Sequence, residues 1–339
     1  MMPVLEAHAA PEALITSPAG ERGPAPFVSL VLPCFNESAS LREFLPALQA
    51  CLRHGFRHWE VVLVDDGSTD DSAAVLAEWA LRPGFRVLML SRNFGKEAAL
   101  TAGIDAAEGD VVILMDADGQ HPAELIAPMV QRWQAGADVV YAARRNRDDQ
   151  SVLMRGFSRA FYRLLNVDAR VHIPDDAGDF RLMDRAVVDA LRQLPERTRM
   201  MKGLYAWVGF RTEALPYEPA PRLRGQTRFR ARRLLGLALV GVTAFTTWPL
   251  RLLSLFGSMM ALLSLAYGAF VTVDFLLFGA KVSGWTTIVV LLLLLGGIQL
   301  LSLGLLGEYL ARIFDEVKGR PLYLVRQHLG AGAPGRAPQ

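Results

Sequence analysis

Residues 110–120 read Asp-Val-Val-Ile-Leu-Met-Asp-Ala-Asp-Gly-Gln, an unbroken run of five apolar residues followed at once by two carboxylates. Such a run is typical of a parallel strand that is covered on both faces. In an extended chain, residues i and i+2 point to the same side, so the side chains of Asp116 and Asp118 can reach one ion. Oxygen ligands of this type favour Mg²⁺ or Mn²⁺. The stretch therefore predicts a buried strand that ends at a metal site, whereas a lone Asp-x-Asp pair without such a strand is usually an exposed turn.

Short apolar runs alternate with longer amphipathic stretches on both sides of this strand. The alternation is typical of βα units and predicts an α/β fold with a mainly parallel sheet and helices on both faces. The predicted strands are residues 28–32, 60–64, 86–90, 110–115 and 138–142, and the predicted helices are residues 38–52, 72–81, 96–107 and 122–134. In such sheets ligands bind at the carboxyl ends of the strands, so the residues that follow each strand carry the candidate chemistry.

Acidic side chains gather at this predicted edge. Glu37, Asp65 and Asp66 end or follow two of the strands and join Asp116 and Asp118. These carboxylates repel one another unless a cation or a donor-rich ligand occupies the site. The pair Asp65-Asp66 could accept hydrogen bonds from the base edge and the ribose hydroxyls of a nucleoside, although Asp, Gly and Ser here also suit a turn with a helix N-cap.

Basic residues are expected near the same edge. Lys96, at the start of a predicted helix, is placed either to touch a diphosphate or to remain solvated; the sequence around it fits neither a P-loop nor a Gly-x-Gly-x-x-Gly motif. Arginines follow the fifth predicted strand and continue into an amphipathic stretch, where Arg155 and Ser158 could hold a phosphate on adjacent turns. The alternative is a merely solvated charged face.

Two stretches, residues 252–273 and 282–307, contain no Asp, Glu, Lys or Arg, and each is long enough to span a bilayer as a helix. Basic residues precede the first stretch and follow the second, and only Lys281 lies between them. The positive-inside rule then predicts a multi-pass protein of the inner (cytoplasmic) membrane, with the globular domain and both termini in the cytoplasm. The net charge of +2 argues against nucleic acid as a partner.

The composition divides the chain into six segments. Residues 1–26 lack the apolar core of a signal peptide and are expected to be a flexible leader. Arginines mixed with large apolar residues before the first span predict amphipathic helices in the headgroup layer. The expected order is leader (1–26), globular domain (27–221), juxtamembrane segment (222–250), transmembrane helices (251–280 and 283–311) and cytoplasmic tail (312–339).

Six motifs in this order carry a family resemblance: Pro-Cys-Phe-Asn-Glu at 33–37, Val-Asp-Asp-Gly-Ser-Thr-Asp at 64–70, Ser-Arg-Asn-Phe-Gly-Lys-Glu at 91–97, Met-Asp-Ala-Asp-Gly-Gln-His-Pro at 115–122, Asp-Ala-Gly-Asp-Phe-Arg-Leu-Met-Asp at 176–184 and Leu-Pro-Glu-Arg at 194–197. Over about residues 27–326 the chain resembles family 2 glycosyltransferases of the Rossmann-like GT-A fold. It is most similar to their polyprenyl-phosphate branch, which includes dolichyl-phosphate mannose synthase and bacterial undecaprenyl-phosphate glucosyltransferases. Where that branch carries a Lys in a Gly-Glu/Gln-Ser/Thr-Lys-Tyr-like stretch, this chain has Arg228.

The resemblance implies an inverting transfer of a sugar from a nucleotide-diphosphate donor such as UDP-glucose to polyprenyl (undecaprenyl) phosphate, for cell-envelope glycan modification. It assigns four sets of residues: catalytic Asp116, Asp118, Asp179 and Arg181, the last two shaping the sugar pocket; donor-binding Pro33, Phe35, Asn36, Glu37, Asp65, Asp66, Asn93, Lys96 and Ala117; metal-binding Asp116, Asp118 and Gln120; and acceptor-phosphate-binding Arg144, Arg155, Ser158 and Arg228.

Two other functions compete with this interpretation. A processive polysaccharide synthase shares the Asp-x-Asp domain, but it normally carries a Gln-x-x-Arg-Trp-type segment and more spans than two. A non-enzymatic membrane scaffold with a decayed catalytic domain is disfavoured by the intact acids. The sequence leaves open whether copies of the chain form a homo-oligomer.

Overall fold

The computed structural model describes residues 22–144, 177–197, 199–217, 248–278 and 284–331. The chain divides into two compact units, which are described separately below. One unit contains a β-sheet with its covering helices and includes the chain from residue 321 onward. The other contains two long helices within residues 229–320.

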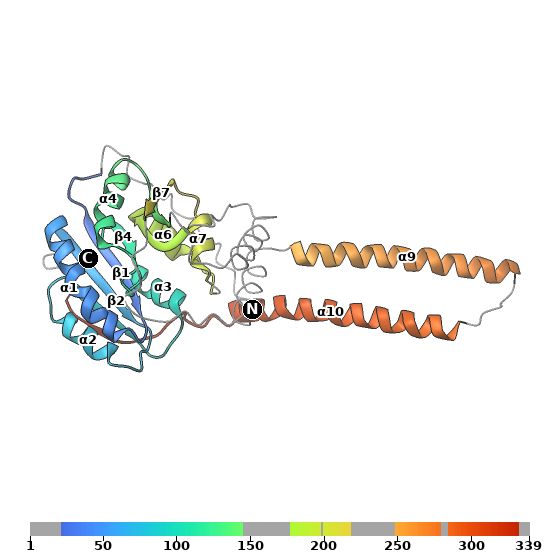
Figure 1. Cartoon of the computed structure of the whole chain (residues 1–339). Helices are drawn as coiled ribbons and strands as arrows, with labels where there is room; N and C mark the ends of the chain where they lie inside the picture. Colours follow the sequence, from blue (N-terminus) through green and yellow to red (C-terminus); the bar gives the residue numbers. More distant parts are fainter. Residues whose placement is uncertain (1–21, 145–176, 198, 218–247, 279–283, 332–339) are drawn as a thin grey trace, which may run out of the picture. The chain divides into compact units, whose positions relative to one another are not determined.

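The sheet has eight strands in the order β7-β5-β6-β4-β1-β2-β3-β8 (Figure 1). Strands β1 to β4 and the pair β5–β7 are joined in parallel, whereas β6 runs antiparallel to β4 and β5, and β8 runs antiparallel to β3. The mainly parallel α/β sheet is therefore confirmed. The bounds are β1 (Phe27–Cys34), β2 (His58–Asp65), β3 (Phe85–Leu90), β4 (Val111–Leu114), β5 (Val139–Arg144), β6 (Ala177–Asp184), β7 (Thr212–Tyr217) and β8 (Val325–Leu329).

Helices cover both faces of the sheet (Figure 1). One layer comprises α1 (Ser38–Gly55), α2 (Ser72–Ala80), the short 3₁₀ turn η1 (Ala123–Leu125) and α4 (Ile126–Gln134). The other layer comprises α3 (Lys96–Ala106), α6 (Arg185–Gln193) and α7 (Met201–Trp207). The first three predicted helices begin at the expected residues. The fourth differs, because Pro122 precedes a 3₁₀ turn rather than the first turn of an α-helix.

Helix α3 lies close against the sheet because a glycine faces it. A Cβ on Gly103 would collide with the side chain of Val31, which is fully buried in β1. Leu100 and Ile104 flank this glycine on α3 and are almost completely buried. Any larger residue at Gly103 would push α3 outward, and the residues at its N-terminal end would move with it.

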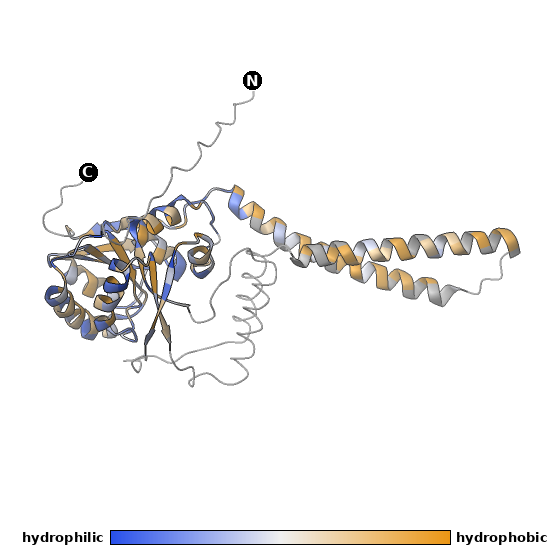
Figure 2. Ribbon diagram, turned by 90° about the horizontal axis from the view of Figure 1, so that it is seen from above, coloured by the Kyte–Doolittle hydropathy of each residue, from blue (hydrophilic) through white to orange (hydrophobic). Residues whose placement is uncertain are grey.

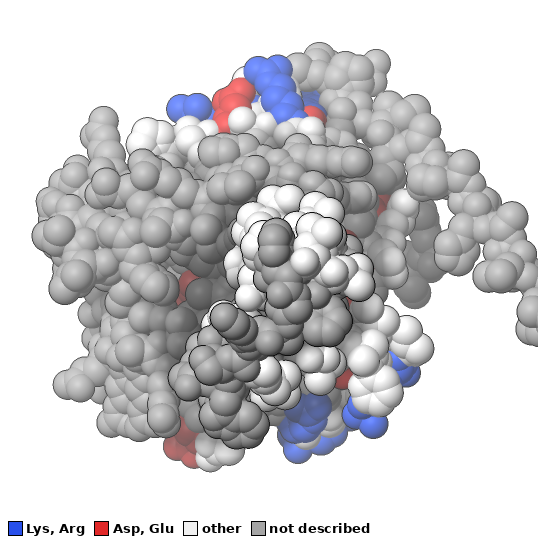
Figure 3. Space-filling model, turned by 90° about the vertical axis from the view of Figure 1, so that its right-hand side faces the viewer, with Lys and Arg blue, Asp and Glu red and all other residues white. Residues whose placement is uncertain are grey.

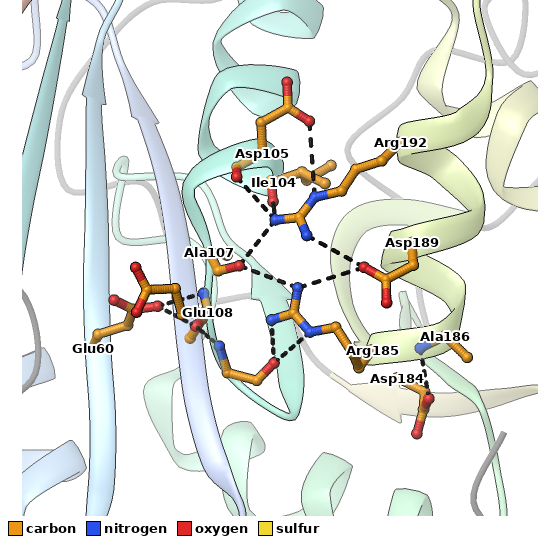
Figure 4. Close-up of polar contacts among 12 residues, drawn as sticks. Glu60, Ile104, Asp105, Ala107, Glu108, Asp184, Arg185, Ala186, Asp189 and Arg192 are labelled. Carbon is orange, nitrogen blue, oxygen red and sulfur yellow. Dashed lines mark hydrogen bonds and ion pairs between the residues drawn. The ribbon is translucent and has the colours of Figure 1, made fainter. Parts of the chain in front are cut away.

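Two arginines of α6 hold the C-terminal end of α3 (Figure 4). The Arg192 side chain donates to the carbonyl oxygens of Ile104, Asp105 and Ala107 at 2.7, 2.9 and 3.0 Å. Arg185 donates to the Ala107 carbonyl at 3.1 Å and to that of Gly109 at 2.8 Å. The last carbonyls of a helix lack partners within it and carry partial negative charge, so the two guanidinium groups satisfy both the hydrogen bonds and the helix dipole.

The described N-terminal residues correct one expectation. Arg22, placed by the sequence in a flexible leader, is buried instead. Its guanidinium donates to the Ala137 carbonyl at 2.7 Å, contacts the Trp133 carbonyl, and pairs with Asp138 at 2.6 Å. A buried guanidinium with these partners anchors the chain before β1, because removing it would leave a buried carboxylate unpaired.

The C-terminal segment contains a strand that the sequence did not predict. Residues 312–339 were expected to be a tail, but β8 pairs with the edge of β3, with Leu88 opposite His328 and Val87 opposite Leu329. Ser91 also donates its backbone N–H to the Leu324 carbonyl at 2.8 Å. The strand has no apolar run because, as an edge strand, most of its side chains face water.

The helical unit consists of α9 (Trp248–Phe278) and α10 (Trp285–Val317), which lie side by side (Figures 1 and 2). Large apolar side chains stand exposed along both, for example Leu262 at 69% and Leu303 at 64%. Figure 3 faces the end of this hairpin, where the described atoms belong to neither acidic nor basic side chains. Within the described residues, Leu294–Val317 is long and apolar enough to cross a membrane, judged by length and composition.

Candidate functional site

The segment after β4 forms a tight turn that presents two carboxylates. The Asp116 N–H donates to Nδ1 of His121 at 3.3 Å, and the Gln120 N–H donates to Oδ1 of Asp118 at 3.0 Å. Gly119, in the left-handed conformation at φ 74°, allows the chain to reverse here. The His121 ring stacks on Phe180 of β6 with ring centroids 4.7 Å apart. His121 was not among the predicted site residues, yet it fixes the turn that carries Asp116 and Asp118.

Lys96 joins this turn to β6. Its ammonium lies 2.6 Å from Oδ1 of Asp116 and 2.7 Å from Oδ2 of Asp179. Burial alone would lower the pKa of Lys96, but the two carboxylates outweigh it and raise the pKa. Burial alone would raise the pKa of Asp179, but the charge of Lys96 outweighs it and lowers the pKa. The first residue of α3 is thus an ion-paired cation whose side chain remains 44% exposed.

Glu37, which follows the end of β1, lies near the same carboxylates. Burial, followed by the negative charges of Asp118 and Asp116, raises the pKa of Glu37 to about 7. Its Oε2 atom is buried and has no hydrogen-bond partner among the described residues. The acids that follow β1 and β4 therefore gather as expected, and a cation would relieve their repulsion.

The protein side chains at this turn supply part of the oxygen ligands that a hard divalent cation needs. Asp116 and Asp118 can supply two carboxylates, with the buried Gln120 beside them. Within the described residues, no group of three or more His, Cys, Asp or Glu side chains is arranged to hold a metal ion. Mg²⁺ and Mn²⁺ bind through one or two carboxylates together with substrate phosphates and water, and the residues present fit that mode.

Asp66 supports the site through the backbone of a loop. Its two carboxylate oxygens accept the N–H groups of Phe94 and Gly95 at 2.7 and 2.9 Å. Next to it, Gly67 has a φ of 68°, and a Cβ there would collide with the backbone of residues 92–93. Asp66 was expected to touch the nucleoside; the structure shows these oxygens holding the loop that leads to Lys96.

Asn36 performs a similar task between the first two loops. It is the only described non-glycine residue with positive φ, at 54°. Its side-chain oxygen accepts the Thr69 N–H at 2.8 Å, and its own N–H donates to the Ser68 hydroxyl at 3.0 Å. An amide tolerates this backbone conformation better than most side chains do, so the residue type follows from the turn.

The other predicted donor residues lie around these loops. Asp65 is 1% exposed and accepts the Ser68 N–H, and Ala117 is fully buried. Phe35 is 43% exposed, and Asn93 is also exposed. Pro33 lies within β1, beside Val64 of β2.

Arg181 lies behind Asp179 on β6. The guanidinium donates to the Gly178 carbonyl at 2.7 Å, and its central carbon lies 3.6 Å from the centroid of the Tyr205 ring on α7. Burial lowers the pKa of Arg181 and raises the pKa of Tyr205. Tyr205 was not among the predicted site residues, because a lone tyrosine in a seven-residue helix carries no motif.

The predicted acceptor residues are mostly outside the described residues. Arg144 is the last residue of β5, at the carboxyl end of that strand, and its side chain is not described. Arg155, Ser158 and Arg228 fall in residues 145–176 and 218–247, which are not described either.

Comparison with known proteins identifies the family. Residues 29–192 match the glycosyl transferase family 2, and residues 248–313 match a second family, the GtrB C-terminal hairpin. A glycosyltransferase of Synechocystis sp. is 44% identical over 299 residues, which are 88% of this chain and 94% of that protein. The chain belongs to family 2 of the glycosyltransferases. The predicted family is confirmed, and the enzyme combines a catalytic sheet with a C-terminal hairpin in one chain.

This glycosyltransferase is also similar to a Shigella protein and to a mycobacterial protein of known structure. A prophage-derived protein of Shigella flexneri, named bactoprenol glucosyl transferase, is 41% identical over 301 residues, which are 88% of this chain and 97% of that protein. The structure of glucosyl-3-phosphoglycerate synthase from Mycobacterium tuberculosis, with Mn²⁺, uridine diphosphate and phosphoglyceric acid bound, aligns with 64% of this chain and 76% of that chain. Its TM-score is 0.46 and its identity is 18%.

Proposed function

We propose that this glycosyltransferase moves a sugar from a nucleotide-diphosphate donor, UDP-glucose or a close relative, to undecaprenyl phosphate at the inner face of the cytoplasmic membrane. The observation that carries the proposal is the pairing, in one chain, of an acidic strand edge with an apolar hairpin. The name of the Shigella relative, which matches across both parts, supports this substrate pair.

The donor would lie over the carboxyl ends of β1, β2 and β4. Asn36 and Asp66 order the two loops on which the nucleoside would rest. Lys96, at the N-terminal end of α3, would face the diphosphate, where an ammonium group and helix N–H groups both favour negative charge. Asp179 and Arg181, two residues apart on β6, would border the sugar.

A divalent cation would be held by Asp116 and Asp118, with Gln120 beside them. When bound, it supplies positive charge that stabilises the departing diphosphate. The protein contributes the fixed turn: the Asp116 N–H is bonded to His121, and the Gln120 N–H holds the Asp118 carboxylate, before the substrate arrives.

The nucleophile would be an oxygen of the acceptor phosphate. It forms a bond to the anomeric carbon as the bond from that carbon to the nucleoside diphosphate breaks, so the configuration inverts. A phosphate monoester is largely ionised at neutral pH because its second pKa is ~6, and the reaction therefore needs no general base. Arg144, Arg155, Ser158 and Arg228 remain the proposed phosphate-binding residues.

The hairpin would keep the enzyme beside its lipid substrate. Both α9 and α10 expose large apolar side chains along their length, which suits two membrane spans. With basic residues on the flanks, the catalytic unit and both termini would lie in the cytoplasm.

The test is transfer in membranes. Membranes containing the enzyme are incubated with undecaprenyl phosphate and with UDP-glucose, UDP-N-acetylglucosamine or GDP-mannose, each labelled in the sugar, and the lipid is then extracted. We expect label in the lipid from one donor, most strongly from UDP-glucose, and none without the acceptor. Label appearing only in a long polymer would contradict the proposal and favour a processive synthase.

A further inference from the structure

The acidic site carries its own cation. Lys96 Nζ lies within 2.7 Å of carboxylate oxygens from two different elements, the turn after β4 and strand β6. Among the described residues, no other ion pair reaches Asp116 or Asp179. The ammonium therefore bridges the two sides of the site.

Lys96 is paired with a carboxylate that is also a proposed metal ligand. Asp116 is a proposed metal ligand, and its Oδ1 atom is the partner of Lys96 at 2.6 Å. Two cations drawn to one small carboxylate repel each other. Without a diphosphate, Lys96 and a metal ion would have to share Asp116 and its neighbouring acids Asp118 and Glu37.

A nucleoside diphosphate changes this balance. Its phosphates add negative charge and give the ammonium a new partner, so Lys96 and a divalent cation can then occupy the site together. The Lys96 side chain is 44% exposed, so it has room to turn. Its backbone is fixed, since Asp66 clamps the two preceding residues.

We propose that Lys96 is a built-in counter-cation that competes with the divalent metal for Asp116 and is released to the diphosphate, so that metal and donor bind together rather than separately. The inference rests on the proposed function, because it describes how the metal and the donor of that reaction bind. The resulting coupling between metal and diphosphate is reciprocal. If the diphosphate strengthens metal binding, the metal strengthens diphosphate binding by the same factor.

The experiment measures Mn²⁺ binding by the full-length enzyme in detergent, from the electron paramagnetic resonance signal of free Mn²⁺. Wild type is compared with Lys96→Met and with a matched control, Lys202→Met. Lys202 lies on α7, near enough for its charge to act on Asp179, but it forms no ion pair within the described residues. Each protein is titrated with Mn²⁺ in three conditions: without nucleotide, with UDP, and with GDP.

We expect Mn²⁺ alone to bind Lys96→Met about tenfold more tightly than wild type, a difference of ~1.4 kcal/mol. UDP should tighten Mn²⁺ binding strongly in wild type and much less in Lys96→Met. The Lys202→Met variant should follow wild type within about twofold. Melting curves of the three proteins verify that each is folded.

Mn²⁺ binding to folded Lys96→Met that is no tighter than to wild type would overturn the proposal. The donor assignment fails in a different way: if neither UDP nor GDP changes Mn²⁺ binding in wild type while Lys96→Met still binds more tightly, the competition stands and the diphosphate donor is wrong. Because no sugar transfer is measured, failure to use polyprenyl phosphate would not affect either result.

Discussion

Single side chains set the chemistry of the acidic edge, and Asp118 offers the sharpest test. An Asp118→Asn variant keeps the shape and the oxygen that accepts the Gln120 N–H but loses the charge. We expect lipid-linked sugar formation to fall by about 100-fold or more, because a metal ligand is lost. The melting temperature should stay near that of wild type, since no packing is removed.

The matched control is Asp71→Asn, an exposed carboxylate that makes no side-chain cap hydrogen bond at the start of α2. It should transfer sugar at the wild-type rate. Near-normal turnover in Asp118→Asn, or full activity with excess EDTA, would remove the metal assignment.

Glu97 gives a pH dependence of stability. Burial, followed by the charge of Asp179, raises its pKa from 4.5 to about 7. Between these values the folded state binds more protons than the unfolded state, so this residue's contribution to stability falls as pH rises. A Glu97→Gln variant mimics the protonated side chain. Its melting temperature should equal that of wild type near pH 4.5 and exceed that of wild type at pH 7.5.

The control for this prediction is Glu78→Gln on the exposed face of α2. Its melting difference from wild type should not change with pH. A constant difference for Glu97→Gln as well would show that this carboxyl is not perturbed.

The position of residues at the ends of buried strands could be predicted from the sequence. Asp116 and Asp118 could be located because a five-residue apolar run fixes where β4 ends. The partner of Lys96 could not be predicted, because Asp179 is 83 residues away on an antiparallel strand. His121 and Tyr205 were missed for the same reason, since their roles depend on rings and charges from other elements.

Helix α3 shows how one element transmits position to the site. Its N-terminal residue pairs with two aspartates, while its C-terminal carbonyls rest on Arg185 and Arg192 (Figure 4). Arg192→Ala removes three of these hydrogen bonds. We expect the free energy of unfolding to fall by about 1–2 kcal/mol, because carbonyls in a partly buried place lose their donors.

Chemical denaturation measures this change. Arg42→Ala, an exposed arginine on α1, is the control and should stay within about 0.5 kcal/mol of wild type. Equal stability of the two variants would show that the α6 arginines do not hold α3.

The elements that sequence reasoning missed share a physical feature. Strands β1 to β5 are largely apolar because both of their faces are covered, and each was predicted to within two residues at either end. β6 carries Asp179 and Arg181 among its apolar residues, and β7 alternates between exposed and intermediate positions. Edge and functional strands need polar residues, so their sequences do not indicate strands.

At the scale of the whole molecule, the sheet is completed by residues that follow the hairpin. A chain limited to residues 22–221 would leave the edge of β3 unpaired. We expect it to be less stable, by about 2–4 kcal/mol, than the same chain with residues 320–331 attached through a flexible glycine-serine linker. Both proteins lack the hairpin helices α9 and α10, so the difference between their free energies of unfolding in denaturant gives the contribution of β8.

A Gln327→Pro version of the linked chain serves as the control. Proline has no N–H to donate and is poorly tolerated in a paired strand, so this version should unfold like the shorter chain. If all three unfold alike, β8 adds nothing to the stability of the sheet.

The late position of β8 also has a consequence for synthesis. Its residues lie roughly 240 positions after their partners in β3, and a ribosome that adds ~5–20 residues per second needs about 10–50 s to cover that distance. During this interval the nascent domain has an open edge, the kind of surface on which strands of other chains assemble. Both apolar helices have been translated before that edge closes, because α9 and α10 precede β8 in the chain. A polypeptide released early would keep its edge exposed to proteases and chaperones, which could thereby recognise it as unfinished.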